Sequence, residues 1–90
     1  MIRIREGYSL RNVLDVYVVM NANRETYEPN CIMSLNGTGA FLWGLLEKGA
    51  DAEMLRIKLT EEYDVDTETA AADVQRFLGL LSAKGLTEEC

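Results

Sequence analysis

The sequence has no histidine, and its 90 residues include only one proline and two cysteines. Without histidine the chain lacks the usual general base, the Ser-His and Cys-His nucleophile pairs and the commonest metal ligand. Cys31 and Cys90 are too few for a disulfide framework or a zinc site, so we expect two reduced thiols, with Cys31 buried. We therefore expect a protein that is not an enzyme, with no catalytic residue, no metal and no cofactor.

Long apolar stretches are also missing. No run approaches the roughly 18 residues of a membrane span. The N-terminal segment MIRIREGYSL lacks the apolar core of a signal peptide. We expect a cytoplasmic protein without a membrane partner. The length and the composition, with 48% hydrophobic and 27% charged residues, indicate a single folded domain over residues 1–90.

Basic residues are scarce, and the acidic excess is unevenly placed. Residues 47–73 hold nine acidic and three basic side chains, which accounts for the whole net charge of −6. A nucleic acid requires a basic surface, and the chain offers none of any size. We expect no nucleic-acid partner.

The first part of the chain is predicted to form strands. Three short apolar runs, rich in β-branched and aromatic residues, are the predicted strands, at residues 8–13, 16–20 and 31–35. Only Leu14-Asp15 separates the first two, which is typical of a hairpin, and a polar loop over residues 21–30 precedes the third. Residues 2–5 also alternate, so residues 1–7 are predicted either to extend the sheet or to fray.

The second part is predicted to form helices. A first helix covers about residues 38–47 and ends with a cation, Lys48, followed by Gly49. Asp51 is placed to cap a second helix. The apolar residues of that helix recur at four-residue spacing: Leu55, Leu59 and Tyr63.

A third helix is predicted to begin at Asp66 or Thr67 and to run to Lys84, where Gly85 closes it and Leu86 folds back on its last turn. Its apolar stripe comprises Ala70, Val74, Phe77, Leu78 and Leu81. Strands first and helices afterwards predict an α+β domain, with the helices on one face of a small antiparallel sheet.

Gly37 and Gly39 lie between the third strand and the first helix. A phosphate-binding loop of the form G-x-G-x-x-G needs a third glycine at its sixth position, which is Leu42 here, and the G-x-x-x-x-G-K-[ST] pattern fails at the same place. The pair therefore predicts a sharp turn from strand to helix, with Asn36 or Thr38 as the cap.

A run of carboxylates at residues 64–68 has the spacing that begins a calcium-binding loop. Such a loop also needs glycine at its sixth position and glutamate at its twelfth, and these positions hold Thr69 and Gln75. The run instead predicts a turn and a helix N-terminus, where carboxylates meet the positive end of the helix dipole.

The predicted strand at residues 31–35 is short, uncharged and free of proline. It is either a central or covered strand, or an edge strand that receives an extended peptide by β-augmentation. The pattern alone leaves both interpretations open.

Four motifs occur in a characteristic order along the chain. They are L-N-x-T-G-A-x-x-W at residues 35–43, E-x-Y-D-V at 61–65, D-V-x-x-F-L-x-x-L at 73–81 and G-L at 85–86. This combination resembles the PqqD family of peptide chaperones, also called the RiPP recognition element. The segment SLRNVLDVYVVM fits the family's first hairpin more loosely, and residues 21–30 make a longer connection than its shortest members have.

The resemblance implies a winged-helix-like domain of three antiparallel strands followed by three helices. It further implies that the leader of a ribosomally made precursor peptide adds as a strand beside the third strand, in the cleft next to the third helix. The domain then presents the precursor to a modifying enzyme, often a radical SAM protein. In the pyrroloquinoline quinone pathway, the peptide that is bound is the precursor from which the quinone is made. The sequence does not show whether this chain serves that pathway or another.

By the same resemblance, two walls hold the leader. The strand wall consists of Cys31, Ile32, Met33, Ser34 and Leu35. The helix wall consists of Asp73, Phe77, Leu80 and Lys84. Phe77 and Leu80 would accept apolar leader side chains, or Phe77 would simply pack in the core, while Asp73 and Lys84 would select charged ones. The residues assigned to the core are Trp43, Leu35 and Tyr63.

Two other functions remain open at this point. A winged-helix transcription regulator would use the third helix for recognition, yet its only cations, Arg76 and Lys84, are offset by Glu68 and Asp73. An adaptor that docks enzymes would use the acidic surface of residues 47–73 against a basic partner, and the sequence does not separate this role from peptide binding.

Overall fold

The computed structural model describes residues 1–21 and 31–89, without the side chains of residues 21, 31 and 32. Most of the expected polar loop, residues 22–30, lies outside the described residues, as does Cys90. The expected burial of Cys31 likewise concerns a side chain outside this description.

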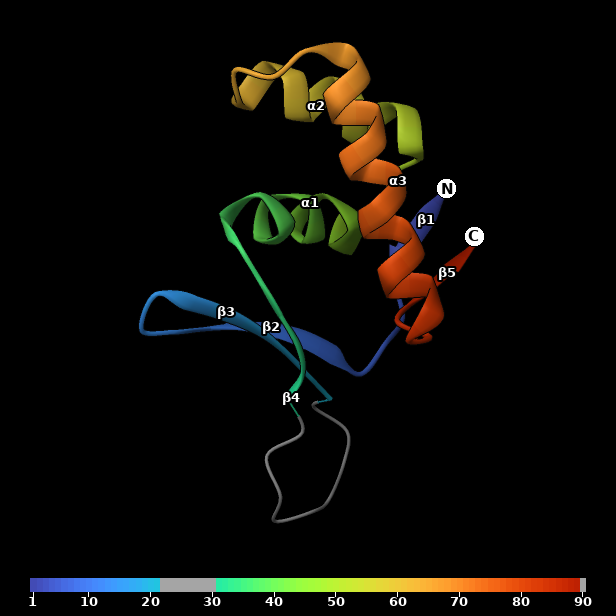
Figure 1. Cartoon of the computed structure of the whole chain (residues 1–90). Helices are drawn as coiled ribbons and strands as arrows, with labels where there is room; N and C mark the ends of the chain where they lie inside the picture. The colour runs from blue at the N-terminus through green and yellow to red at the C-terminus, as the bar shows by residue number, and fades with distance from the viewer. Residues whose placement is uncertain (22–30, 90) are drawn as a thin grey trace.

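A small antiparallel sheet precedes three helices, and a second pair of short strands joins the two ends of the chain (Figure 1). The strands are β1 (Ile2–Ile4), β2 (Tyr8–Val13), β3 (Val16–Asn21), β4 (Cys31–Leu35) and β5 (Thr87–Glu89). The helices are α1 (Gly37–Lys48), α2 (Ala52–Glu62) and α3 (Thr67–Ala83). The predicted α+β class, with a three-stranded antiparallel sheet and three helices, is confirmed.

The three-stranded sheet has the order β2-β3-β4, so β4 is one of its two edges. The predicted hairpin is confirmed, because Val13 pairs with Val16 and leaves Leu14-Asp15 as a two-residue turn. Leu14 adopts a φ of 58° and is 92% exposed, an uncommon backbone conformation for a branched side chain. Tyr17 pairs with Leu35, which places the hairpin turn near the end of β4 that leads into α1.

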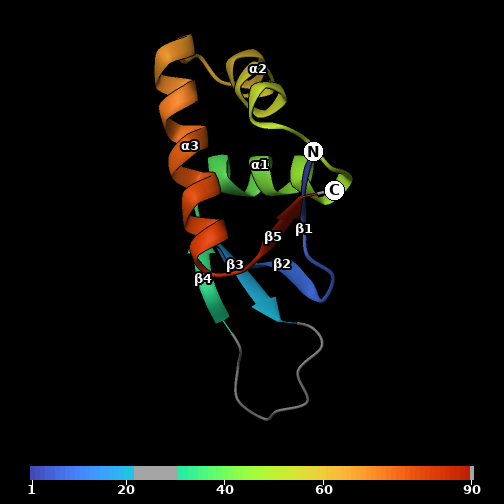
Figure 2. The same ribbon diagram turned by 90° about the vertical axis from the view of Figure 1, so that its right-hand side faces the viewer.

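The first residues neither extend this sheet nor fray. β1 pairs antiparallel with β5, from Ile2 opposite Glu89 to Ile4 opposite Thr87, and also exchanges two backbone hydrogen bonds with Ala50 at 2.8 and 2.9 Å. Figures 1 and 2 show the two ends of the chain side by side. β5 was not predicted, since its partner lies more than eighty residues away in the sequence.

Each helix begins at a side chain that accepts a hydrogen bond from a backbone N–H three residues later. These caps and their donors are Asn36 with Gly39, Asp51 with Met54, and Asp66 with Thr69, at 2.8, 2.7 and 2.7 Å. Such bonds satisfy N–H groups that have no partner within the helix. Hydrogen bonds from the side chain and the backbone N–H of Thr69 lower the pKa of Asp66 below its ordinary value. The predicted helix start at the carboxylate run is confirmed.

The glycine pair forms the turn from β4 into α1. Gly39 is buried, and a Cβ added there would lie 3.1 Å from the Leu35 Cβ, tighter than ordinary van der Waals contact. Gly37 has no such neighbour. The close approach of α1 to the end of β4 therefore explains Gly39 without a bound phosphate.

The C-terminus of α3 is closed by Gly85, as predicted. Gly85 has a φ of 69° and donates to the Ser82 carbonyl at 3.0 Å, while Leu86 donates to the Leu81 carbonyl at 3.0 Å. These two bonds make a Schellman motif, in which the residue after the glycine packs on the last turn. Both Leu81 and Leu86 are fully buried, and the chain then turns into β5.

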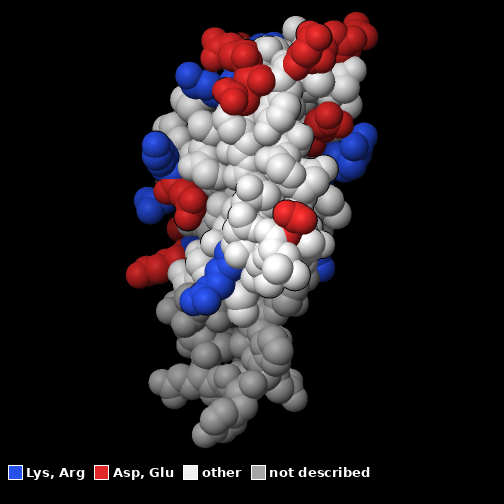
Figure 3. Space-filling view, turned by 90° about the vertical axis from the view of Figure 1, so that its left-hand side faces the viewer, with Lys and Arg blue, Asp and Glu red and all other residues white. Residues whose placement is uncertain are grey.

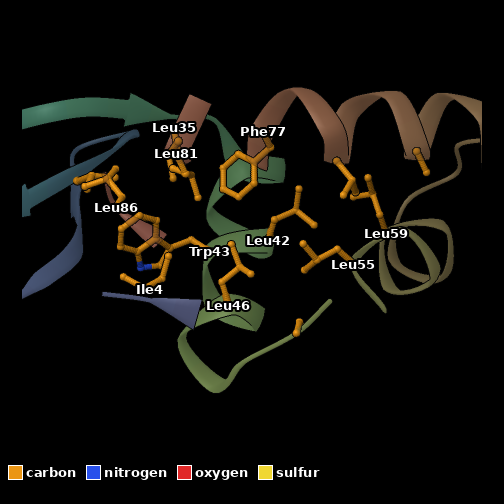
Figure 4. Packing of buried hydrophobic residues seen from close by; sticks show 14 residues of the cluster. Ile4, Leu35, Leu42, Trp43, Leu46, Leu55, Leu59, Phe77, Leu81 and Leu86 are labelled. Carbon is orange, nitrogen blue, oxygen red and sulfur yellow. The ribbon is translucent and has the colours of Figure 1, made fainter. Parts of the chain in front are cut away.

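The hydrophobic core gathers around α1, whose Leu42, Trp43 and Leu46 are buried (Figure 4). Residues from both sheets and both other helices pack on it, including Ile4, Val19, Leu35, Leu55, Leu59, Phe77 and Leu81. Trp43 and Leu35 are thus core residues, as predicted. Tyr63 is half-buried against the core and meets the Phe41 ring edge-on at a centroid distance of 5.6 Å.

Candidate functional site

A groove of about 290 Å³ lies between β4, the start of α1 and α3. Its lining consists of Met33, Ser34, Leu35, Asn36, Thr38, Gly39, Leu42, Asp73, Arg76, Phe77 and Leu80. β4 is followed by the tight turn at Gly39, where the chain changes direction into α1, and Figure 2 shows both elements next to α3.

Six of the nine residues expected at a peptide site line this groove: Met33, Ser34, Leu35, Asp73, Phe77 and Leu80. Cys31 and Ile32 belong to β4, but their side chains are outside the description. Lys84 is the exposed C-cap of α3, which ends at Ala83, and it is not part of the lining.

Five lining residues were not singled out for binding from the sequence: Asn36, Thr38, Gly39, Leu42 and Arg76. Helical periodicity contained a signal for Arg76, which lies three residues after Asp73 and so on the same side of α3. Asn36 and Gly39 were recognised only for their part in the turn. Nothing local in the sequence shows that the same turn also lines a groove.

The groove has an apolar floor and one charged pair. Phe77, Leu35 and Leu42 belong to the core and are at most 9% exposed, whereas Leu80 is 48% exposed. Phe77 therefore combines the two roles that the sequence left open, since it packs in the core and also lines the groove. Arg76 Nη1 donates to Asp73 Oδ1 at 3.2 Å. A ligand in this groove would meet apolar surface, the uncharged polar residues at its β4–α1 side and two opposite charges.

The backbone of β4 adds directional hydrogen-bonding capacity to the groove. β4 pairs with β3 on one side only, and the strand order gives it no neighbour on the other side within residues 1–21 and 31–89. An edge strand presents backbone N–H and C=O groups that an extended chain can pair with. The arrangement can therefore hold a peptide through its backbone and sort its side chains in the groove.

Residues 1–21 and 31–89 contain neither a metal-binding cluster nor a helix that could span a membrane. Among them, no group of three or more His, Cys, Asp or Glu side chains is placed to hold a metal ion. No helix in this part of the chain is long and apolar enough to cross a bilayer.

Residues 17–86 match the family model described as coenzyme PQQ synthesis protein D (PqqD). The match covers most of the chain and includes β4, α1 and α3, which together line the groove. The chain belongs to the PqqD family. The family predicted from the four motifs is thus confirmed.

Two solved structures are similar to this PqqD-family domain over nearly its full length. One is TbiB1 in complex with the TbiA(beta) leader peptide, 28% identical, with a TM-score of 0.74, covering 98% of this chain and 96% of that one. The other is a lasso peptide synthetase B1 complexed with the leader peptide, 23% identical, with a TM-score of 0.74 and 98% of each chain covered. At that identity the second shows the shared fold alone. No curated protein matches this PqqD-family sequence significantly.

Proposed function

We propose that this PqqD-family chain is a non-catalytic peptide-binding domain. It binds the leader of a ribosomally synthesised precursor peptide, which adds as a strand beside β4, and it presents the precursor to a modifying enzyme. The observation that carries the proposal is the coincidence of an open sheet edge and a groove along the same strand, β4. The leader peptide bound to TbiB1, at 28% identity, supports the same assignment.

In this arrangement the leader backbone pairs with β4 and its alternate side chains enter the groove. Apolar side chains that enter would cover the exposed part of Leu80 and the accessible edge of Phe77. The five residues of β4 supply the strand wall, including Cys31 and Ile32 through their backbone. Lys84, outside the groove, would meet only a leader that continues past the end of α3.

The partner enzyme is proposed on family grounds. PqqD-like domains of this kind are generally binding domains, so the modification itself falls to a second protein. A radical SAM maturase is our first candidate for that second protein. We place this chain in the cytoplasm and propose that it binds no cofactor of its own. Whether the product is pyrroloquinoline quinone or another modified peptide depends on the precursor.

Electrostatics weighs against the rival assignment of a DNA-binding winged helix. On α3, Arg76 is paired with Asp73, and Glu68 and Asp66 stand at the start of the helix. Figure 3 shows acidic side chains gathered at the end of the molecule that carries α2 and the start of α3. Affinity for duplex DNA comes largely from basic side chains that neutralise the DNA phosphates. This acidic surface would repel the phosphates.

An ester scan of the leader tests strand addition. The synthetic leader of the precursor encoded beside this chain is prepared with single amide-to-ester replacements, which remove one N–H donor and keep every side chain. Strand pairing predicts losses of about two- to twelvefold in affinity at every second position across the segment beside β4, and little change between them. Losses without a period of two, or none at all, would contradict strand addition.

A further inference from the structure

Among the described residues, Asp73 and Arg76 are the only charged ones that line the groove, and they occupy one side of one turn of α3. The side chain of Asp73 is 35% exposed, whereas that of Arg76 is 70% exposed. The carboxylate is therefore the member of the pair held closer to the protein surface. The guanidinium extends into solvent.

The ion pair between Asp73 and Arg76 can be broken at small cost in free energy. A single contact of 3.2 Å, between Arg76 Nη1 and Asp73 Oδ1, holds it together, and exposed ion pairs at this helical spacing contribute little to stability. Arg76 can turn into water at small cost because it is already mostly solvated. An incoming cation can then take the Asp73 carboxylate, whereas an incoming anion that took Arg76 would leave Asp73 unpaired beside another negative charge.

The surrounding charge favours a cation as well. Five exposed carboxylates lie along the end of α2 and the start of α3, at residues 61, 62, 64, 66 and 68. Figure 3 shows acidic side chains gathered at the end of the molecule that carries these two elements. A field of one sign concentrates ligands of the opposite sign and speeds their association. A basic leader segment would be drawn toward the Asp73 end of the groove.

Helix geometry sets where the basic residue lies in the leader. Asp73 and Phe77 are one turn apart on α3, a rise of about 6 Å, and residues i and i+2 of a strand are about 6.8 Å apart. A strand that runs along α3 therefore places neighbouring inward side chains against Asp73 and Phe77 in turn. Leu80, less than one turn further along, widens the apolar part.

We infer that the leader recognised by this groove carries a lysine or arginine that takes Asp73 from Arg76, two residues away from a large apolar side chain on Phe77 and Leu80. The inference rests on the proposed function and specifies its substrate class. Arg76 is then an internal counterion that the leader cation must displace, and leaders without a cation lack the contact with Asp73.

Selection from a display library tests the inference. Random 12-residue peptides are selected against the full 90-residue protein, against Asp73→Asn and against Arg76→Gln. Glu62→Gln is the matched control, because it removes one exposed carboxylate that does not line the groove. The peptides enriched by the wild type are then measured against all four proteins by fluorescence anisotropy.

The wild-type pool should be enriched in lysine or arginine two positions from a leucine, phenylalanine or similar residue. For those peptides Asp73→Asn should weaken binding at least about tenfold, since a hydrogen bond to a charged group is lost. Arg76→Gln should tighten it about two- to fivefold by removing the competing cation. Glu62→Gln should change it less than about twofold.

Selected peptides that are acidic or uncharged would overturn the inference. Equal losses of affinity in Asp73→Asn and Glu62→Gln would overturn it too, because they would indicate long-range electrostatic attraction without an ion pair to Asp73. These outcomes leave the proposed function intact if the selected peptides still shift the amide signals of residues 33–35. Selected peptides that leave those amides unchanged, or a pool without any consensus, would count against the proposed function itself.

Discussion

Truncating Leu80 to alanine should weaken leader binding while leaving the fold almost unchanged. Leu80 lines the groove but is 48% exposed in the free domain, so about half of its surface remains for a leader to cover. Complete burial of a leucine side chain contributes about 1.5–3 kcal/mol, so the exposed half corresponds to about 0.7–1.5 kcal/mol, or roughly three- to twelvefold in Kd.

Ile57→Ala is the matched control for this substitution. Ile57 lies on α2, is 41% exposed and does not line the groove, so its truncation removes a comparable apolar surface elsewhere. Urea unfolding followed through Trp43, the only tryptophan and a fully buried one, should show similar stabilities for both variants. Leader binding is measured by calorimetry. Equal affinities for the two variants would refute the placement of the leader against Leu80.

Three further predictions concern the fold. Leu46→Ala should lower the free energy of unfolding by about 2–5 kcal/mol in urea titrations, because the Leu46 side chain of α1 is fully buried in the core. Leu14→Gly should raise Tm and stabilise the domain by up to about 1 kcal/mol, since glycine accepts the φ of 58° without steric strain; a lower Tm would contradict this. The lowered pKa of Asp66 means that its stabilising contribution is present above the ordinary carboxyl pKa and is lost as the pH falls through the folded-state value. The difference in urea midpoint between the wild type and Asp66→Asn should therefore shift against the wild type as the pH falls from about 7 through the carboxyl range, and a constant difference would exclude titration of Asp66 as the cause.

Features of the fold that depend on neighbours in the sequence could be predicted. Asp51 and Asp66 begin their helices as expected, because a short side chain that accepts a bond from the backbone three residues later is a local signal. Gly85 and Leu86 end α3 for an equally local reason. The Leu14-Asp15 hairpin follows from spacing alone.

The pairing of β1 with β5 could not be predicted, because it joins the two ends of the chain. Thr87–Glu89 is a three-residue polar segment with no pattern of its own, and only its partner makes it a strand. Its position follows from the turn at Gly85 and from the docking of Leu86 in the core, which are tertiary consequences.

The residues that line the groove could be predicted only in part from the sequence. Counting along an unbroken helix pairs Asp73 with Phe77, Leu80 and Lys84, but α3 ends before Lys84 and the chain turns away there. Arg76 lines the groove instead and contacts Asp73, three residues earlier on α3. Which side chains face the hollow depends on how α3 packs on α1 and β4, and helical periodicity alone does not determine it.

The most direct test of the account is an amide NMR titration of isotope-labelled protein with the synthetic leader of the precursor encoded beside it, followed by hydrogen exchange of the complex. Leader addition to β4 predicts signal shifts at residues 33–35 and 73–80 and slower exchange of backbone amides in β4. Shifts confined to β2, the other edge of the sheet, or to the acidic end of α2 would contradict it.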